Sequence, residues 1–256
     1  MLLAFDLDKT VVTQDGRLPP AIRQAIHKAR EDGHLVTVLT GRPQVSAAPF
    51  IRELDLTGPY SVNHGVKVLD TGGNTLRHKR ISAREVSRLL ETYGRRADLE
   101  FSCMLEDTLF VKNPQDARWS WAHTLNRRLE KYNPKRELEA DKIVFSANGG
   151  STLLEREISE EHPEFITYLW DDGYLEITGP ETDKGAALEL IAETLGVPRQ
   201  QTIAFGDGPN DITMLAWAGR SIAVGPDAHP EVRRVAHEHI PSPEEGGVAS
   251  WLETNL

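Results

Sequence analysis

The chain has 256 residues, of which 29 are Lys or Arg and 39 are Asp or Glu, so its formal net charge at pH 7 is −10. This charge repels phosphate backbones and anionic lipid surfaces, so neither a nucleic acid nor a membrane is an expected partner. The single Cys cannot form an internal disulfide, and the N-terminus lacks the basic start of a signal peptide. We therefore expect a cytoplasmic globular protein with a substantial buried core.

Short apolar runs alternate with helical patterns in the first part of the chain. Leu2–Phe5 is apolar at every position, as in a strand that is buried on both faces. Pro19 and Pro20 open a predicted helix, and Gly33 stands where the helix C-cap is expected. A second buried strand is predicted over Leu35–Leu39. A strand, a helix and a strand in this order indicate the α/β class, with a parallel sheet covered by helices.

The same alternation returns near the end of the chain. A helix is predicted over Lys184–Leu195, with Gly196 as its stop, and a strand over Thr202–Phe205. A further strand is predicted over Ile222–Val224, and a closing helix begins at about Gly247. The second part of the chain therefore continues the α/β pattern of the first.

The middle of the chain combines helices with paired strands. Ser82–Glu85 is a capping box that opens a helix, and a long helix is expected over Trp119, Leu125 and Leu129. Strands are predicted at 100–104, 109–112, 143–146, 165–170 and 174–177. We interpret 81–177 as an inserted α+β domain, with residues 1–80 and 178–256 forming one core domain.

Two acidic residues, Asp6 and Asp8, follow the first predicted strand. In an extended chain, side chains two positions apart point to the same side, so the two carboxylates should converge. Two such charges repel each other unless a cation lies between them or one carboxylate is protonated. Taken alone, the pair is explained about equally well as the cap of an ordinary loop.

The segment Gly206–Asp211 follows a later predicted strand. Asp207, Asn210 and Asp211 offer the hard oxygen ligands that Mg²⁺ prefers. A helix N-cap accounts for Asn210 or Asp211 individually, but it does not account for acidic residues at several strand ends. Because ligands of open α/β sheets bind at the carboxyl ends of the strands, one shared site is expected there.

Thr40, Gly41 and Lys184 supply groups that suit a bound anion. A hydroxyl followed by a residue that lets the backbone approach closely fits a phosphate oxygen, although an ordinary turn explains Thr40-Gly41 better when the pair is taken alone. Lys184 opens a helix, where its charge opposes the helix dipole. We therefore expect Lys184 to have an anionic partner.

Four motifs resemble, in order, those of the haloacid dehalogenase superfamily of phosphohydrolases: Asp6-x-Asp8-x-Thr10, Thr40-Gly41-Arg42, Lys184-Gly185-Ala186-Ala187-Leu188 and Gly206-Asp207-Gly208-Pro209-Asn210-Asp211. The long stretch between the second and third motifs resembles the Cof-type subgroup, in which a large cap is inserted at this point. The resemblance covers nearly the whole chain. It implies a Rossmann-like parallel sheet with helices on both faces, plus the inserted α+β cap.

The resemblance also implies an activity. It implies a phosphatase that hydrolyses small phosphorylated metabolites, such as sugar phosphates, through an aspartyl-phosphate intermediate. Asp6 is the implied nucleophile, and Asp8 is the implied acid and base. Thr40, Gly41 and Lys184 are implied to bind the phosphate of the substrate.

Mg²⁺ is the cofactor that the resemblance implies. Its ligands would be a carboxylate oxygen of Asp6, the backbone carbonyl of Asp8, and Asp207. Asn210 and Asp211 would orient this shell. The cation would also balance the acidic residues that are gathered at the strand ends.

The resemblance has two departures, because Lys9 and His64 stand where this subgroup usually has Gly. Two other functions remain open: a phosphotransferase or phosphomutase on the same scaffold, and a non-catalytic phosphate-binding switch protein. The presence of Asp8 argues against the switch protein, which needs no second acid.

Overall fold

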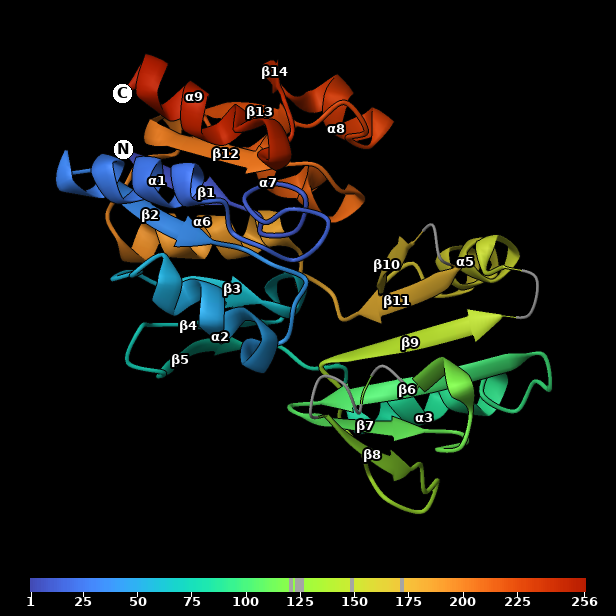
Figure 1. Ribbon diagram of the computed structural model, residues 1–256. Coiled ribbons are helices and arrows are strands. Elements are labelled where there is room, and N and C mark those ends of the chain that lie inside the picture. The colour runs from blue at the N-terminus through green and yellow to red at the C-terminus, as the bar shows by residue number, and fades with distance from the viewer. Residues whose placement is uncertain (120–121, 123–126, 148–149, 171–172) are drawn as a thin grey trace. The chain divides into compact units, whose positions relative to one another are not determined.

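The computed structural model describes residues 1–256 except 120–121, 123–126, 148–149 and 171–172 (Figure 1). The chain divides into two compact units, one of Met1–His78 with Asp183–Leu256 and one of Lys79–Thr182. We call them the core unit and the insert unit. Over the described part of the chain, no helix combines the length and the apolar character that crossing a membrane requires.

The core unit is built on a five-stranded parallel sheet with the order β14-β13-β12-β1-β2. Its strands are β1 (Leu2–Phe5), β2 (Leu35–Val38), β12 (Thr202–Gly206), β13 (Arg220–Val224) and β14 (Glu238–Ile240). The register pairs Phe5 with Phe205 on one side and with Val38 on the other. The chain segments that follow β1, β2 and β12 therefore leave the sheet at the same edge.

Helices cover both faces of this sheet because alternate side chains of each strand point to opposite faces. Leu3 and Phe5 pack in one apolar cluster with α1 and α9, whereas Leu2 and Ala4 pack in another with α6, α7 and α8. These helices and their neighbours are α1 (Pro20–Glu31), α2 (Gln44–Glu53), α6 (Lys184–Thr194), α7 (Ile212–Trp217), α8 (Pro230–Val235), α9 (Gly247–Asn255) and the short 3₁₀ helices Asn63–Gly65, Arg199–Gln201, Pro209–Asp211 and Pro243–Glu245. The predicted α/β core with helices on both faces is confirmed (Figure 1).

A small antiparallel sheet that the sequence did not predict follows β2. It consists of β3 (Tyr60–Val62), β4 (Lys67–Leu69) and β5 (Thr75–His78). A parallel bridge between Leu39 and Ser61 joins it to the end of β2. This bridge places the 3₁₀ turn Asn63–Gly65 beside Thr40, at the edge where the main strands end.

The insert unit is a six-stranded sheet with helices, as predicted for an α+β domain. Its order is β10-β11-β9-β6-β7-β8, and every pair is antiparallel except β7 with β8. Residues of α3 and α5 pack on Phe101, Phe145 and Leu175 of the sheet. The elements are β6 (Leu99–Leu105), β7 (Thr108–Val111), β8 (Arg128–Lys131), β9 (Lys142–Ala147), β10 (Ile166–Leu169), β11 (Tyr174–Thr178), α3 (Ala83–Thr92), α5 (Thr152–Glu161) and the 3₁₀ helix Ala117–Trp119.

The expectation of one long helix over Trp119, Leu125 and Leu129 is wrong. Trp119 ends a short 3₁₀ helix, and Leu129 lies in β8, which pairs with β7. Leu125 lies outside the described residues. In β8 the partly buried Leu129 stands between two exposed charged residues, which is the alternation of an edge strand and not of a helix. Leu129 packs in a small cluster with Trp119.

Candidate active site

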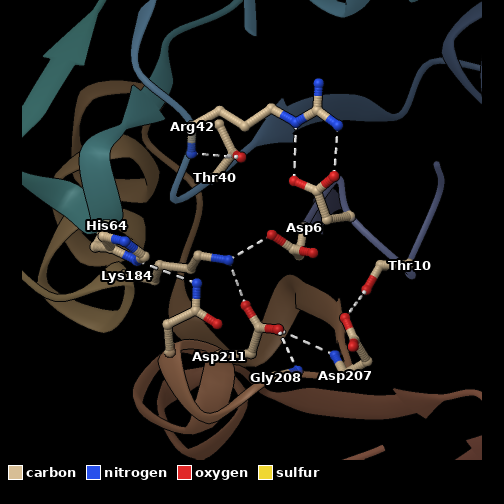
Figure 2. A network of polar contacts seen from close by, with 11 residues as sticks. Asp6, Thr10, Thr40, Arg42, His64, Lys184, Asp207, Gly208 and Asp211 are labelled. Atoms are coloured by element: carbon tan, nitrogen blue, oxygen red, sulfur yellow. Dashed lines mark hydrogen bonds and ion pairs between the residues drawn. The ribbon is translucent and has the colours of Figure 1, made fainter. Parts of the chain in front are cut away.

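Acidic side chains from the ends of β1 and β12 gather at one place (Figure 2). Asp6 directly follows β1, Asp207 directly follows β12, and Asp211 ends the 3₁₀ turn that comes next. One carboxylate oxygen from each lies within 4.8 Å of the others. A set of carboxylate oxygens at this spacing fits a hard divalent cation such as Mg²⁺. The predicted meeting of these strand ends is present in the structure.

The cluster carries more negative charge than its surroundings compensate. Burial raises the pKa of Asp6 well above its usual value, and neighbouring carboxylates raise it further, although Lys184 opposes them. Burial also raises the pKa of Asp207 to about 7, with Asp211 adding to the effect. A bound cation would stabilise the ionised forms of both groups. The raised pKa values and the carboxylate oxygens of the cluster are therefore both consistent with a site for a cation.

Lys184 lies inside this cluster as the first residue of α6. Asp183 caps the helix by accepting a hydrogen bond of 3.0 Å from the backbone N–H of Ala186. The Lys184 ammonium is fully buried and donates to Asp6 Oδ1 and to Asp211 Oδ1, each at 2.5 Å. Burial alone would lower the pKa of Lys184, but the two carboxylates raise it above its usual value. The anionic partners expected for Lys184 include these two carboxylates.

Asp211 organises the loop that carries Asp207. Its Oδ2 accepts hydrogen bonds from the backbone N–H groups of Asp207 and Gly208, at 3.0 and 2.9 Å, while its Oδ1 accepts from Lys184. A Cβ on Gly206 would lie 2.6 Å from the Asp211 side chain, so this position requires Gly. Both Asp211 oxygens are therefore engaged, one with the loop backbone and one with Lys184.

Asp8 does not join the cluster. Its half-exposed carboxylate accepts two hydrogen bonds from Arg42, at 2.8 Å from Nε and 2.5 Å from the terminal nitrogen. The Arg42 guanidinium also lies over the ring of Phe50, 4.6 Å from its centroid. The sequence showed Arg42 within a motif but gave it no role. The two carboxylates after β1 therefore have separate cationic partners.

Thr40 and Gly41 lie at the end of β2, beside this cluster. The buried Thr40 hydroxyl accepts a hydrogen bond of 3.1 Å from the backbone N–H of Arg42, so its own proton can be donated to another group. The ring of His64 lies so close to Gly41 that a Cβ on Gly41 would be 2.3 Å from the ring.

Thr10 contacts the acidic cluster through Asp207. Its hydroxyl donates a hydrogen bond of 3.1 Å to Asp207 Oδ1, a contact that the sequence gave no means to find.

The predicted residue Asn210 is buried in the 3₁₀ turn after β12. Its amide Nδ2 lies 3.1 Å from Nδ1 of His64, which is also buried. The sequence singled out His64 only as a departure from the subgroup pattern. The structure thus brings Asp6, Thr40, Lys184, Asp207 and Asp211 together where the parallel strands end (Figure 2). Asp8 is hydrogen-bonded to Arg42, and Asn210 to His64.

Comparison with known proteins assigns the chain to a family. The model of the haloacid dehalogenase-like hydrolases matches residues 3–252, so the chain belongs to this family. The 5-amino-6-(5-phospho-D-ribitylamino)uracil phosphatase YitU of Bacillus subtilis is 27% identical, over 98% of this chain and 96% of its own. The HMP-PP phosphatase of Serratia proteamaculans is also 27% identical, over 98% of this chain and 94% of its own.

Solved structures show the same fold over the whole chain. A haloacid dehalogenase-like hydrolase from Bacteroides thetaiotaomicron has a TM-score of 0.85 at 22% identity, and 100% of this chain and 99% of that chain are covered. A sugar phosphatase of haloacid dehalogenase subclass IIB has a TM-score of 0.82 at 20% identity, with 99% and 98% covered. The predicted superfamily and enzyme class are confirmed, because the family is one of hydrolases and both relatives above are named phosphatases.

Proposed function

We propose that this protein is a Mg²⁺-dependent phosphatase that hydrolyses small phosphorylated metabolites, such as sugar phosphates, through an aspartyl-phosphate on Asp6. The observation that carries this proposal is the position of Asp6. Its buried carboxylate lies at the end of β1, bonded to Lys184 through one oxygen and grouped with Asp207 and Asp211. A buried carboxylate, an ammonium group and further carboxylate oxygens that could hold a metal ion therefore lie together at the ends of neighbouring strands, which supports the proposal.

In the first step, an Asp6 oxygen forms a bond to phosphorus as the bond from phosphorus to the leaving oxygen breaks. Lys184 donates to Asp6 Oδ1, so the second oxygen is the one that attacks. Asp6 must be ionised to do so, and burial opposes its ionisation. Lys184 counteracts that effect, and a bound Mg²⁺ would supply further charge stabilisation to Asp6 and to the phosphoryl oxygens.

Asp8 transfers the protons in this proposal. It donates a proton to the leaving alcohol, and in the second step it takes one from the water that hydrolyses the aspartyl-phosphate to inorganic phosphate. The two hydrogen bonds from the Arg42 guanidinium hold the Asp8 carboxylate in one orientation. One Asp8 oxygen can carry the proton to the leaving group while the other still accepts a hydrogen bond from Arg42, so Arg42 orients Asp8 in this step.

Thr40, Gly41 and Lys184 would bind the transferring phosphoryl group. The Thr40 hydroxyl can donate a proton, and the backbone at Gly41 can approach a ligand closely because no Cβ intervenes. The Lys184 ammonium neutralises charge on the phosphoryl oxygens. Mg²⁺ would be held by Asp6, the backbone carbonyl of Asp8 and Asp207, with Asn210 and Asp211 orienting them.

The insert unit would act as a cap that selects the leaving group. We place this cap at residues 81–177, between two parts of a catalytic core at 1–80 and 178–256. The named substrates of the relatives, a ribitylaminouracil phosphate and HMP-PP, are then reasonable first compounds to test beside sugar phosphates.

The proposal is tested by measuring inorganic phosphate released from an aryl phosphate and from a panel of phosphorylated metabolites, with Mg²⁺ or with excess chelator. We expect release with Mg²⁺ only. Transfer of the phosphoryl group to an added alcohol without phosphate release would identify a phosphotransferase instead. Binding of phosphate without turnover of any compound would identify a non-catalytic binding protein.

A further inference from the structure

We propose that His64 is a positioning residue of this site: it fixes the side-chain amide of Asn210 so that its carbonyl oxygen faces the loop that carries Asp207. This inference rests on the proposed function and adds a residue to it. His64 belongs to the turn after β3, which is neither of the strands that carry the acidic cluster. Its effect on the site is therefore exerted through its contacts with the neighbouring loops.

The contact between His64 and Asn210 orients the amide. His64 is 1% exposed, and its Nδ1 accepts a hydrogen bond of 3.1 Å from Asn210 Nδ2. The other end of the amide lies against the acidic loop, because a Cβ on Gly208 would be 2.8 Å from Asn210 Oδ1. A rotation of the amide by 180° would exchange a donor for an acceptor at both ends. The hydrogen bond to His64 opposes that rotation.

His64 also contacts the loop on the other side of Asp6. Its backbone N–H donates to the carbonyl of Thr40 at 3.0 Å, and its ring lies directly on Gly41. In the sheet order β12-β1-β2, the strand β1, which Asp6 follows, lies between the strands that lead into the two loops that His64 touches. One side chain thus links the predicted phosphate-binding loop with the loop proposed to hold the metal (Figure 2).

The backbone at His64 indicates that this arrangement has an energetic cost. His64 has φ 61° and ψ 19°, and the preceding Asn63 has φ 51°, both in the left-handed region. A residue with a Cβ is strained in this conformation, whereas Gly adopts it freely. The contacts of the buried ring offset this cost, and substitution by Gly would remove the strain together with the contacts.

Two substitutions separate positioning from simple filling of space. His64→Asn keeps a hydrogen-bond acceptor near Asn210, because Oδ1 of Asn and Nδ1 of His are both attached directly to Cγ. Asn also tolerates a left-handed backbone. In His64→Gly, the acceptor and the ring are lost while the backbone strain is relieved. If the ring only filled space, both variants would have similar effects, because both lose its volume.

The experiment measures the Mg²⁺ dissociation constant by isothermal titration calorimetry on the full chain without substrate, with circular dichroism to confirm folding. For His64→Gly we expect Mg²⁺ to bind roughly 10–100-fold more weakly, the usual effect of losing a group that orients metal ligands. For His64→Asn we expect a change of less than about 3-fold. At saturating Mg²⁺, His64→Gly should recover most of its kcat, since its defect lies in metal binding.

The same measurement in an Asn210→Ala background tests the route of the effect. If His64 acts through Asn210, His64→Gly should produce little further weakening in that background. Equal affinities for Mg²⁺ in the wild type and in His64→Gly would overturn the inference, as would a loss in His64→Asn as large as that in His64→Gly. A wild-type protein that binds no Mg²⁺ would instead overturn the proposed function.

Discussion

Arg42 donates two hydrogen bonds to Asp8, at 2.8 and 2.5 Å, and this pairing separates Asp8 from the cluster around Asp6. Asp6 is buried and bonded to Lys184, whereas Asp8 is half-exposed and paired with a guanidinium. Two carboxylates that are two residues apart therefore have different electrostatic environments. Such a difference is what separate roles as nucleophile and as acid–base group require.

Asp6→Asn should abolish phosphate release in the presence of Mg²⁺, because the amide lacks the nucleophilic charge and is nearly isosteric with the carboxylate. The fold should be retained, since a buried group whose pKa is raised by burial loses its charge in this variant. Phosphate release from an aryl phosphate and the far-UV circular dichroism spectrum measure the two effects. Asp32→Asn, an exposed residue that pairs with Lys28 at the end of α1, is the matched control and should stay fully active.

Asp8→Asn should lower kcat by about 10²–10⁴-fold on an alkyl phosphate, because a poor leaving group needs a proton. The loss should be smaller on a p-nitrophenyl phosphate, whose leaving group departs as an anion. Comparable losses on both compounds would show that Asp8 is not the acid. The role of Asp8 as the acid is therefore measured by the ratio of the two losses in kcat, and not by either rate alone.

Arg42→Lys should lower kcat more on the alkyl phosphate than on the aryl phosphate, as Asp8→Asn does, but by a smaller factor. The reason is that Lys keeps the charge but cannot form the two-point contact with Asp8. We expect a loss of about 10-fold or less on the alkyl phosphate and a smaller loss on the aryl phosphate, consistent with a misplaced acid. Arg30→Lys provides a matched control, since Arg30 bonds to Leu54 and Asp55 elsewhere in the core unit. An Arg42→Lys protein with unchanged rates on both compounds would exclude this role.

The elements of the core could be predicted because each is marked locally. Leu2–Phe5 is continuously apolar, and the α1 pattern ends at Gly33, whose φ of 91° is the left-handed conformation expected of a C-cap region. The strands β4 and β5 were missed because they are three or four residues long and lack a continuous apolar run. Such short strands depend on tertiary contacts more than on their own sequence.

The sequence could predict that acidic residues from different strand ends meet, but it could not predict the partners of the individual side chains. Asp6, Asp8 and Asp207 stand at strand ends, and the order of the parallel strands brings such ends together. By contrast, His64 and Asn210 are 146 positions apart, and Asp8 and Arg42 are 34 apart. No local pattern pairs residues at such separations. Their contacts follow from the register of the sheet and from the bridge between Leu39 and Ser61.

Removal of Mg²⁺ with excess chelator should abolish activity, and added Mg²⁺ should restore it. Asp207→Ala should raise the Mg²⁺ concentration needed for half-maximal activity, because one carboxylate of the cluster is lost. Ca²⁺ should support activity poorly, since its larger and looser coordination shell misplaces the attacking oxygen. Titration of the rate with each metal measures these effects, and full activity in excess chelator would contradict the prediction.

The stability of the metal-free protein should depend on pH through Asp207. Burial and then Asp211 raise its pKa in the folded chain from 3.8 to about 7, so between these values the folded state binds more protons than the unfolded state. The free energy of unfolding contributed by this group therefore falls as pH rises from about 4 to about 7, and it levels off above that range. Thermal unfolding in excess chelator, compared between the wild type and Asp207→Asn, isolates this contribution. As pH rises from about 4 to about 7, we expect the wild type to lose stability relative to Asp207→Asn. Addition of Mg²⁺ at pH 8 should restore the stability of the wild type. A difference in stability between the two proteins that does not change with pH would contradict the raised pKa of Asp207.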